Sequence, residues 1–143
     1  MDQPPGAPQA LHPGADTDPA PFTWSRSFPA TPDQVPQARR FLADILNGSL
    51  LTPDALLCLS ELVTNAIEHS HSSRPGGRFT VRASVRSGSL RVEVEDEGGP
   101  WQPPSKYDTQ RGRGLIIVGQ LARDWNITGD RTTAPRTVWF EIG

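Results

Sequence analysis

The residues of this chain best suited to chemistry are Glu61 and Asn65, which lie four positions apart in the segment from Leu59 to His69. Apolar residues recur through this segment at helical spacing, so we predict a helix with one buried face. Residues four apart on a helix project from the same side, one turn above the other. An amide oxygen can ligate a hard cation, and a carboxylate can accept a proton. The alternative is a solvated helix face that contains Asn65 as a poor helix former.

A second candidate, Asp96, lies at the end of a predicted strand. Leu90, Val92 and Val94 alternate with charged residues, and the same parity places Asp96 on their buried face. A carboxylate in that position is costly unless it is hydrogen-bonded to something. Its partner could be a ligand or another group of the protein, and the local pattern does not choose between them.

A third candidate is the glycine pair Gly112 and Gly114, which precedes an apolar-faced helix. Glycines that open a helix expose its unpaired N–H groups, which suits a phosphate. Glycine also serves any tight turn, so the pair is a weak signal by itself. The preceding loop, residues 97–112, is rich in glycine, proline and polar groups. Loops of this length in compact domains tend to be lids or binding loops.

The elements that must position these residues can be predicted from periodicity and turn signals. Alternating apolar and polar residues indicate strands, and apolar residues every three or four positions indicate helices. Thr31-Pro32 and Thr52-Pro53 are typical helix starts, and Asn47-Gly48 is a typical helix end. The predicted order is strand (22–28), helix (31–48), helix (52–69), strand (78–86), strand (90–96), helix (from 115), strand (125–128) and strand (137–142).

This order predicts an α+β two-layer sandwich in which the helices cover one face of a mixed, mainly antiparallel sheet. The three candidate stretches would then converge on one end of the sandwich. The predicted domain is residues 22–143. Residues 1–21 contain six prolines and almost no large apolar side chain, so we predict a disordered tail.

Composition limits the classes of function. A chain of 143 residues is one domain's worth, and a net charge of -2 provides no basic field for nucleic acid. The single cysteine, Cys58, excludes an internal disulfide. No apolar run reaches the roughly 20 residues that span a bilayer, and no signal pattern opens the chain. We therefore expect a soluble cytoplasmic protein with no membrane or direct nucleic-acid partner.

Together, these stretches resemble the histidine-kinase-like (Bergerat) ATP-binding fold shared by DNA gyrase, mismatch-repair ATPases and sensor histidine kinases. More closely, residues 22–143 resemble the bacterial anti-sigma-factor serine/threonine protein kinases. The motifs that carry the resemblance are Glu61-Leu62-Val63-Thr64-Asn65-Ala66, Asp96-Glu97-Gly98, Gly112-Arg113-Gly114-Leu115 and Thr137-Val138-Trp139-Phe140.

The resemblance implies ATP and Mg²⁺ as cofactors and gives each candidate a role. Asn65 would be the protein ligand of Mg²⁺ and Glu61 the general base that deprotonates an acceptor serine. Asp96 would accept a hydrogen bond from the adenine amino group. Gly98 would lie beside the adenine base, and Thr137 would lie near Asp96 and the adenine. The phosphates would be bound by the side chain of Arg111 or Arg113 and by the backbone of Gly112, Arg113, Gly114 and Leu115.

The chain departs from the family pattern at Pro100, where glycine is common, and proline stiffens the entry to the loop.

The resemblance implies a kinase that phosphorylates a serine on an anti-anti-sigma (STAS-type) partner and holds a sigma factor away from RNA polymerase. Kinases of this kind often form homodimers. The alternative is a binding module in which ATP controls partner binding without phosphoryl transfer. A histidine kinase would need a phosphoacceptor histidine, and the helix at 33–48 has none. His69 and His71 are too few for an ordinary metal site.

Overall fold

The computed structural model describes residues 22–70, 73–98, 109–129 and 135–143. Its helices and strands follow one another in the predicted order. They are β1 (Phe22–Pro29), α1 (Gln34–Leu46), α2 (Thr52–His69), β2 (Arg78–Arg86), β3 (Ser89–Asp96), α3 (Thr109–Leu121), β4 (Asp124–Thr128) and β5 (Arg136–Ile142).

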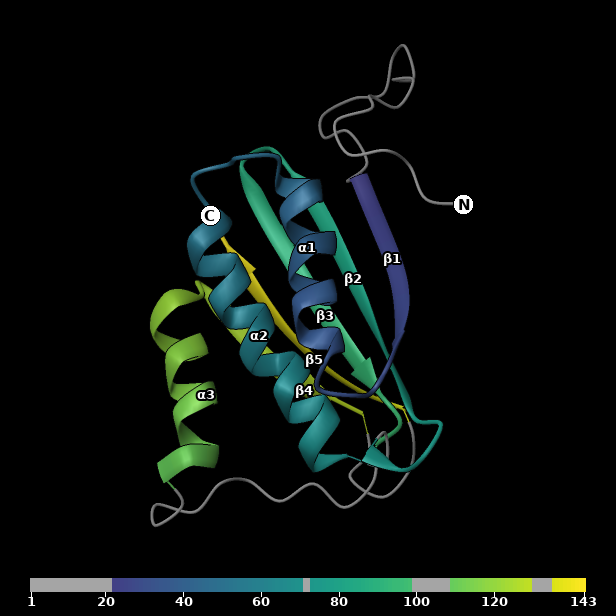
Figure 1. Cartoon of the computed structure of the whole chain (residues 1–143). Helices are drawn as coiled ribbons and strands as arrows, with labels where there is room; N and C mark the ends of the chain where they lie inside the picture. Colours follow the sequence, from purple (N-terminus) through teal and green to yellow (C-terminus); the bar gives the residue numbers. More distant parts are fainter. Residues whose placement is uncertain (1–21, 71–72, 99–108, 130–134) are drawn as a thin grey trace.

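The strands form one sheet in the order β1-β2-β3-β5-β4, and the helices lie together on one of its faces (Figure 1). The predicted α+β sandwich is therefore confirmed. The sheet is more uniform than the predicted mixed one, because every neighbouring pair of the described strands is antiparallel. Hairpins join β2 to β3 and β4 to β5, while α3 lies between β3 and β4 in the chain.

The core lies between the sheet and the helices and follows the predicted periodicities. In β3, residues alternate between half-buried and buried from Ser89 to Asp96. Phe28 and Phe79 face each other across β1 and β2 with their rings stacked 5.3 Å apart. Each fully buried large apolar side chain contributes about 1.5–3 kcal/mol to stability. The apolar side chains below 2% exposure include Phe28, Phe79, Phe140, Leu42, Leu59, Leu62, Leu90 and Val63.

Helix α1 begins later than its sequence indicates. Thr31 was the predicted N-cap, but the backbone N–H of Gln34 closes a turn on the Thr31 carbonyl, and Asp33 is the N-cap. The Thr31 hydroxyl donates to the Asp33 carboxylate instead of to the helix backbone. The predicted end is confirmed, because Asn47 is the C-cap in the left-handed conformation with φ 47°.

The single cysteine, Cys58, is buried in α2 with 0% exposure. Burial raises its pKa to about 11, and the negative charges of Asp54 and Glu61 contribute. A thiol in this environment stays protonated and packs as a small apolar group.

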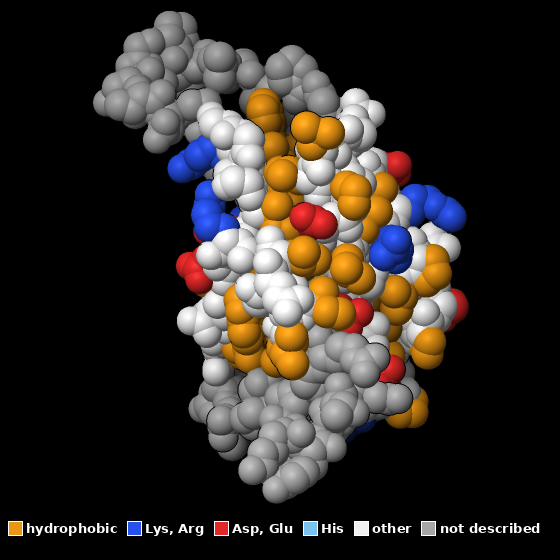
Figure 2. Space-filling view, turned by 90° about the vertical axis from the view of Figure 1, so that its left-hand side faces the viewer, with side chains coloured by type: hydrophobic (Ala, Val, Ile, Leu, Met, Phe, Trp, Pro, Cys, Tyr) orange, Lys and Arg blue, Asp and Glu red, His pale blue; other side chains and the backbone are white. Residues whose placement is uncertain are grey.

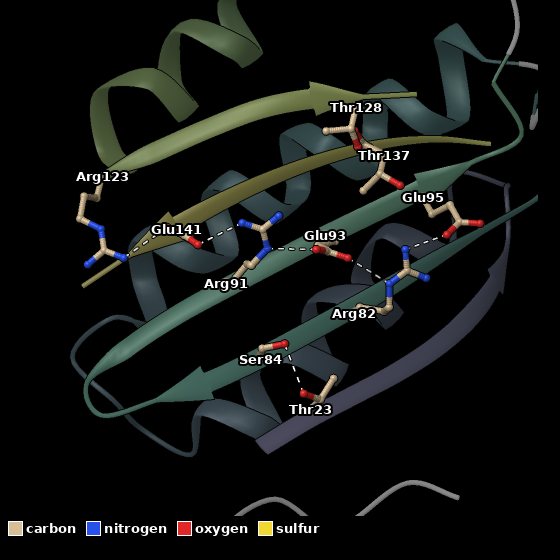
Figure 3. Close-up of polar contacts among 10 residues, drawn as sticks. All are labelled: Thr23, Arg82, Ser84, Arg91, Glu93, Glu95, Arg123, Thr128, Thr137 and Glu141. Atoms are coloured by element: carbon tan, nitrogen blue, oxygen red, sulfur yellow. Dashed lines mark hydrogen bonds and ion pairs between the residues drawn. The ribbon is translucent and has the colours of Figure 1, made fainter. Parts of the chain in front are cut away.

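The other face of the sheet carries a chain of ion pairs that crosses β2, β3 and β5 (Figure 3). Arg82 contacts Glu93 and Glu95 at 3.1 and 2.7 Å, while Arg91 contacts Glu93 and Glu141 at 3.0 Å each. These side chains remain 27–35% exposed, so each pair contributes only about 0–1 kcal/mol. Polar residues on this face and apolar residues on the other are typical of an antiparallel sheet with one solvated side.

The flank of the molecule where α3 lies is rich in apolar side chains (Figure 2). Among the described residues, the large apolar side chains that remain exposed are Leu50, Leu57 and Ile116. None of the described helices is both long enough and apolar enough to cross a membrane.

Candidate functional site

Helix α2 holds the first two candidates in a fixed relation. It runs without interruption from Thr52 to His69 and packs on β3, with α1 and α3 on its two sides (Figure 1). Its buried stripe includes Leu59, Leu62, Val63 and Ala66, each at 0–1% exposure. Glu61 and Asn65 border this stripe on one side of the helix, and both are half-buried. The predicted geometry of the pair is confirmed, and the pair does not lie on a fully solvated face.

Asp96 faces the helices, as parity predicts, and its side chain is only 1% exposed. One oxygen, Oδ1, accepts the backbone N–H of Gly98 at 2.7 Å. The other, Oδ2, accepts Nε of Arg136 at 3.1 Å and Nη2 of the same side chain at 2.6 Å. The sequence allowed either a ligand or another group of the protein as the partner of Asp96, and the structure shows hydrogen bonds to groups of the protein.

The charge state of Asp96 depends on these neighbours. Burial raises the pKa of the Asp96 carboxyl, and this is the largest effect on it. The positive charge and hydrogen bonds of Arg136, together with the N–H of Gly98, oppose that rise. The three donors thus favour the ionised carboxylate, which accepts hydrogen bonds and donates none.

Gly98 is buried and has a φ of 73°, in the left-handed region that favours glycine. This conformation turns its N–H back onto the carboxylate two residues earlier. The backbone therefore approaches the Asp96 side chain closely. The implied contact of Gly98 with a base remains a prediction.

Thr137 does not lie beside Asp96, and that expectation is wrong. In the β3–β5 register Thr137 pairs with Glu95, while Arg136 pairs with Asp96. Thr137 is on the face of the sheet that carries the ion pairs, near Thr128 and Glu95 (Figure 3). Successive side chains in a strand point to opposite faces. The residue that faces Asp96 is therefore Arg136, one position before Thr137, and Thr137 points to the opposite face of the sheet.

Arg136 is the site residue that sequence reasoning missed. It is 2% exposed and is the first residue of β5. The signal was present in the sequence, because Arg136 shares the parity of Val138, Phe140 and Ile142, all of which are buried. A cation on the inward face of one strand can meet a carboxylate on the inward face of its neighbour.

The start of α3 also differs from the prediction. The helix begins at Thr109, so Gly112 and Gly114 lie inside it and do not open it. Only the first turn of a helix has unpaired N–H groups, and Gly112–Leu115 follow that turn of α3, so their contact with phosphates stays a prediction. The side chains of residues 109–114, including Arg111 and Arg113, lie outside the described part of the structure, as do Pro100, His71 and the side chain of His69.

The three candidate stretches come to one end of the sandwich, as predicted. The C-terminal half of α2, the end of β3 and the start of α3 all lie toward the lower end in Figure 1, and α2 contacts both β3 and α3. Among the described residues, no three His, Cys, Asp or Glu side chains gather as a metal cluster. This end therefore offers a half-buried amide and carboxylate on α2 and a buried carboxylate on β3.

Comparison with known proteins identifies the family to which this chain belongs. The profile of the histidine kinase-like ATPase domain matches residues 28–140, most of the chain. The chain belongs to this ATPase family. The serine-protein kinase RsbW of Bacillus subtilis is 28% identical to this ATPase-family chain over 111 residues, covering 65% of the chain and 69% of RsbW. This similarity supports the predicted relationship to the anti-sigma-factor kinases.

Two further matches are partial. The blue-light-activated histidine kinase 2 of Erythrobacter litoralis is 40% identical over 68 residues, which are 47% of this chain and 20% of that kinase. The crystal structure of the RsbU and RsbW domains of a Mycobacterium tuberculosis protein superposes with a TM-score of 0.61 at 21% identity. That match covers 82% of this chain and 32% of the other, and it confirms the fold.

ATP is the nucleotide that the family implies, and the residues present fit it. Asp96 supplies a buried acceptor suited to an amino group. Asn65 supplies an amide oxygen, which is a ligand type that Mg²⁺ accepts. Glu61, one helical turn away, supplies a half-buried carboxylate.

Proposed function

We propose that this chain is an ATP- and Mg²⁺-dependent serine/threonine protein kinase of the anti-sigma-factor type. The observation that carries the proposal is the half-buried pair of Glu61 and Asn65 on one side of α2, above the sheet in which Asp96 faces inward. Phosphoryl transfer requires that the acceptor hydroxyl, the metal ion and the nucleotide are held in position. Glu61 can act as the general base, Asn65 as a metal ligand and Asp96 as the acceptor for adenine. The similarity to RsbW, a serine-protein kinase, supports this function.

The binding roles follow from the chemistry of each group. The amide oxygen of Asn65 holds Mg²⁺, which takes few protein ligands and keeps water and phosphate oxygens. Asp96 accepts the amino group of the adenine through Oδ1, and Gly98 brings the backbone close to the base. The first turn of α3 binds the phosphates through its N–H groups and its positive end, with Arg111 or Arg113 adding charge.

Bound Mg-ATP supplies the phosphoryl group and neutralises much of its charge. Glu61 takes the proton of the acceptor serine hydroxyl, whose oxygen bonds to the γ-phosphorus as the bond to the β–γ bridging oxygen breaks. A positioned general base of this kind typically contributes about 10²–10⁴-fold to the rate. Glu61 lies one helical turn from Asn65 on α2, and this spacing supports the pairing of a general base with a metal ligand.

The proposed substrate is a serine on an anti-anti-sigma protein of the STAS type. The same chain would also bind a sigma factor and hold it away from RNA polymerase, as a homodimer or a monomer. Both partners follow from the family resemblance, and they are proposed for the ATP-loaded protein.

The first test is calorimetric titration of Mg-ATP into the wild-type chain and the Asn65→Ala variant. We expect wild-type binding and a loss or sharp weakening in the variant. Asn126→Ala is the matched control, because Asn126 is exposed on β4 and its side chain accepts only the N–H of Ile127 among the described contacts. Absence of Mg-ATP binding to the wild type would refute the proposed function.

The second test separates the kinase from a binding module. Purified STAS-type proteins with an acceptor serine are incubated with the chain and radiolabelled Mg-ATP. Glu61→Ala should reduce transfer by about 10²–10⁴-fold and leave Mg-ATP affinity within about threefold. Glu68→Ala, which removes an exposed carboxylate from the same helix, is the control. Mg-ATP binding without any transfer by the wild type would instead favour the non-catalytic, ATP-gated regulator.

A further inference from the structure

The buried ion pair of Asp96 and Arg136 differs from the rest of its sheet face, where the neighbouring buried side chains are apolar. Its neighbours Val92, Val94 and Val138 on β3 and β5 are apolar and 0–6% exposed. Replacing a buried ion pair by apolar residues of similar volume is often neutral or stabilising. Stability therefore gives little reason for a carboxylate and a guanidinium at this position.

The contacts of the pair limit what else Asp96 can bind. An ionised carboxylate has about four lone-pair positions. Oδ2 receives two N–H groups from Arg136, at 2.6 and 3.1 Å, and Oδ1 receives the Gly98 N–H at 2.7 Å. One acceptor position is left, and it is on Oδ1. A ligand can therefore place a single N–H donor on Asp96.

We propose that Arg136 is a specificity-determining residue of the nucleotide site, which restricts Asp96 to one donor and thereby selects adenine over guanine. The inference rests on the proposed binding of Mg-ATP at Asp96. The adenine amino group needs only one acceptor. Guanine presents two adjacent donors, N1–H and the 2-amino group, and binds a carboxylate best through both of its oxygens. Arg136 blocks that bidentate contact by occupying Oδ2.

Arg136 favours adenine in a second way, because its positive charge favours the ionised form of Asp96. Burial raises the pKa of the Asp96 carboxyl, and the positive charge of Arg136 opposes this. Without the arginine, a protonated carboxyl could donate to the guanine carbonyl oxygen and accept from its N1–H. Loss of Arg136 should therefore relax base selection through both routes.

The test compares the dissociation constants of Mg-ATP and Mg-GTP by calorimetry in the wild type and Arg136→Met. Methionine is long and flexible, fills much of the arginine's space and has no donor. We expect the wild type to prefer Mg-ATP and the ratio of the Mg-GTP to Mg-ATP constants to fall by about tenfold or more in the variant, as for one charge-assisted hydrogen bond. Arg82→Met is the matched control, because it removes an arginine paired to Glu93 and Glu95 on the opposite face.

If the Arg136→Met variant does not fold, Arg136→Lys is used for the same comparison of Mg-ATP and Mg-GTP. Lysine keeps the buried charge but lacks the planar fork of arginine, so one donor replaces two on Oδ2, and we expect the ratio to fall by about threefold or more. An unchanged ratio in either folded variant overturns the inference, as does equal binding of the two nucleotides by the wild type. Absence of any Mg-ATP binding by the wild type is a different result, because it refutes the proposed function itself.

Discussion

Breaking the ion pair between Asp96 and Arg136 should destabilise the fold far more than removing the pair entirely. The two side chains are 1% and 3% exposed and join at 2.6 Å, so salt and water screen them little. Removing one partner leaves the other charge buried, which costs about 3–5 kcal/mol. We therefore expect Arg136→Met and Asp96→Asn each to lose that amount of unfolding free energy. The double variant should lose much less than the sum, with a coupling of at least about 2 kcal/mol.

Urea unfolding followed by tryptophan fluorescence measures this cycle. With a slope of about 2 kcal/mol per molar urea, each single variant should unfold at a midpoint about 1.5–2.5 M below the wild type. The comparison cycle is Arg82 with Glu95, whose side chains are both 33% exposed at 2.7 Å, and it should give only about 0.2–1 kcal/mol. Additive single costs, or a coupling no larger than that of the exposed pair, would refute the reasoning.

Three further predictions concern single residues. Gly98→Ala forces a side chain onto a φ of 73° and should cost about 1–2 kcal/mol, measured by thermal unfolding; an unchanged midpoint would show that the loop relaxes. Burial acts to raise the pKa of Glu93, but hydrogen bonds from two arginines outweigh it and lower the pKa, so Glu93→Gln should lose about 0.5–1 kcal/mol at pH 7. That deficit should vanish as the pH falls through the lowered folded pKa, because the ionised Glu93 stabilises the fold only above it; an equal urea-midpoint deficit at pH 3 would contradict this. Leu62 is 1% exposed, so Leu62→Ala should lower the free energy of unfolding by about 2–5 kcal/mol. Leu57 on the same helix is 42% exposed, so Leu57→Ala should lower it by under about 1 kcal/mol. Equal losses for the two variants in urea unfolding would contradict this position of the core.

Much of the site follows from the sequence, because local rules fix it. Glu61 and Asn65 share a side of α2 since the helix period is 3.6 residues, and Asp96 faces inward since strand side chains alternate. Neither statement needs knowledge of which elements meet. The element order and the α+β class follow for the same reason, from periodicities that each segment carries alone.

The errors lie where local signals compete or where two distant segments meet. The starts of α1 and α3 were misplaced because turn and cap residues can serve either a turn or a helix. Thr137 was assigned to the adenine site through its motif, although its parity with Val138 and Phe140 places it on the opposite face.

The sequence by itself thus determined the residues that face the core and the two chemical groups that share one side of α2. Only the tertiary structure decided that β5 lies beside β3 in the register that sets Arg136 against Asp96. These residues are 40 positions apart in the chain, and no local periodicity encodes their pairing. The register is fixed by packing the apolar faces of both strands under the helices, and a shift of one residue would turn those faces toward water.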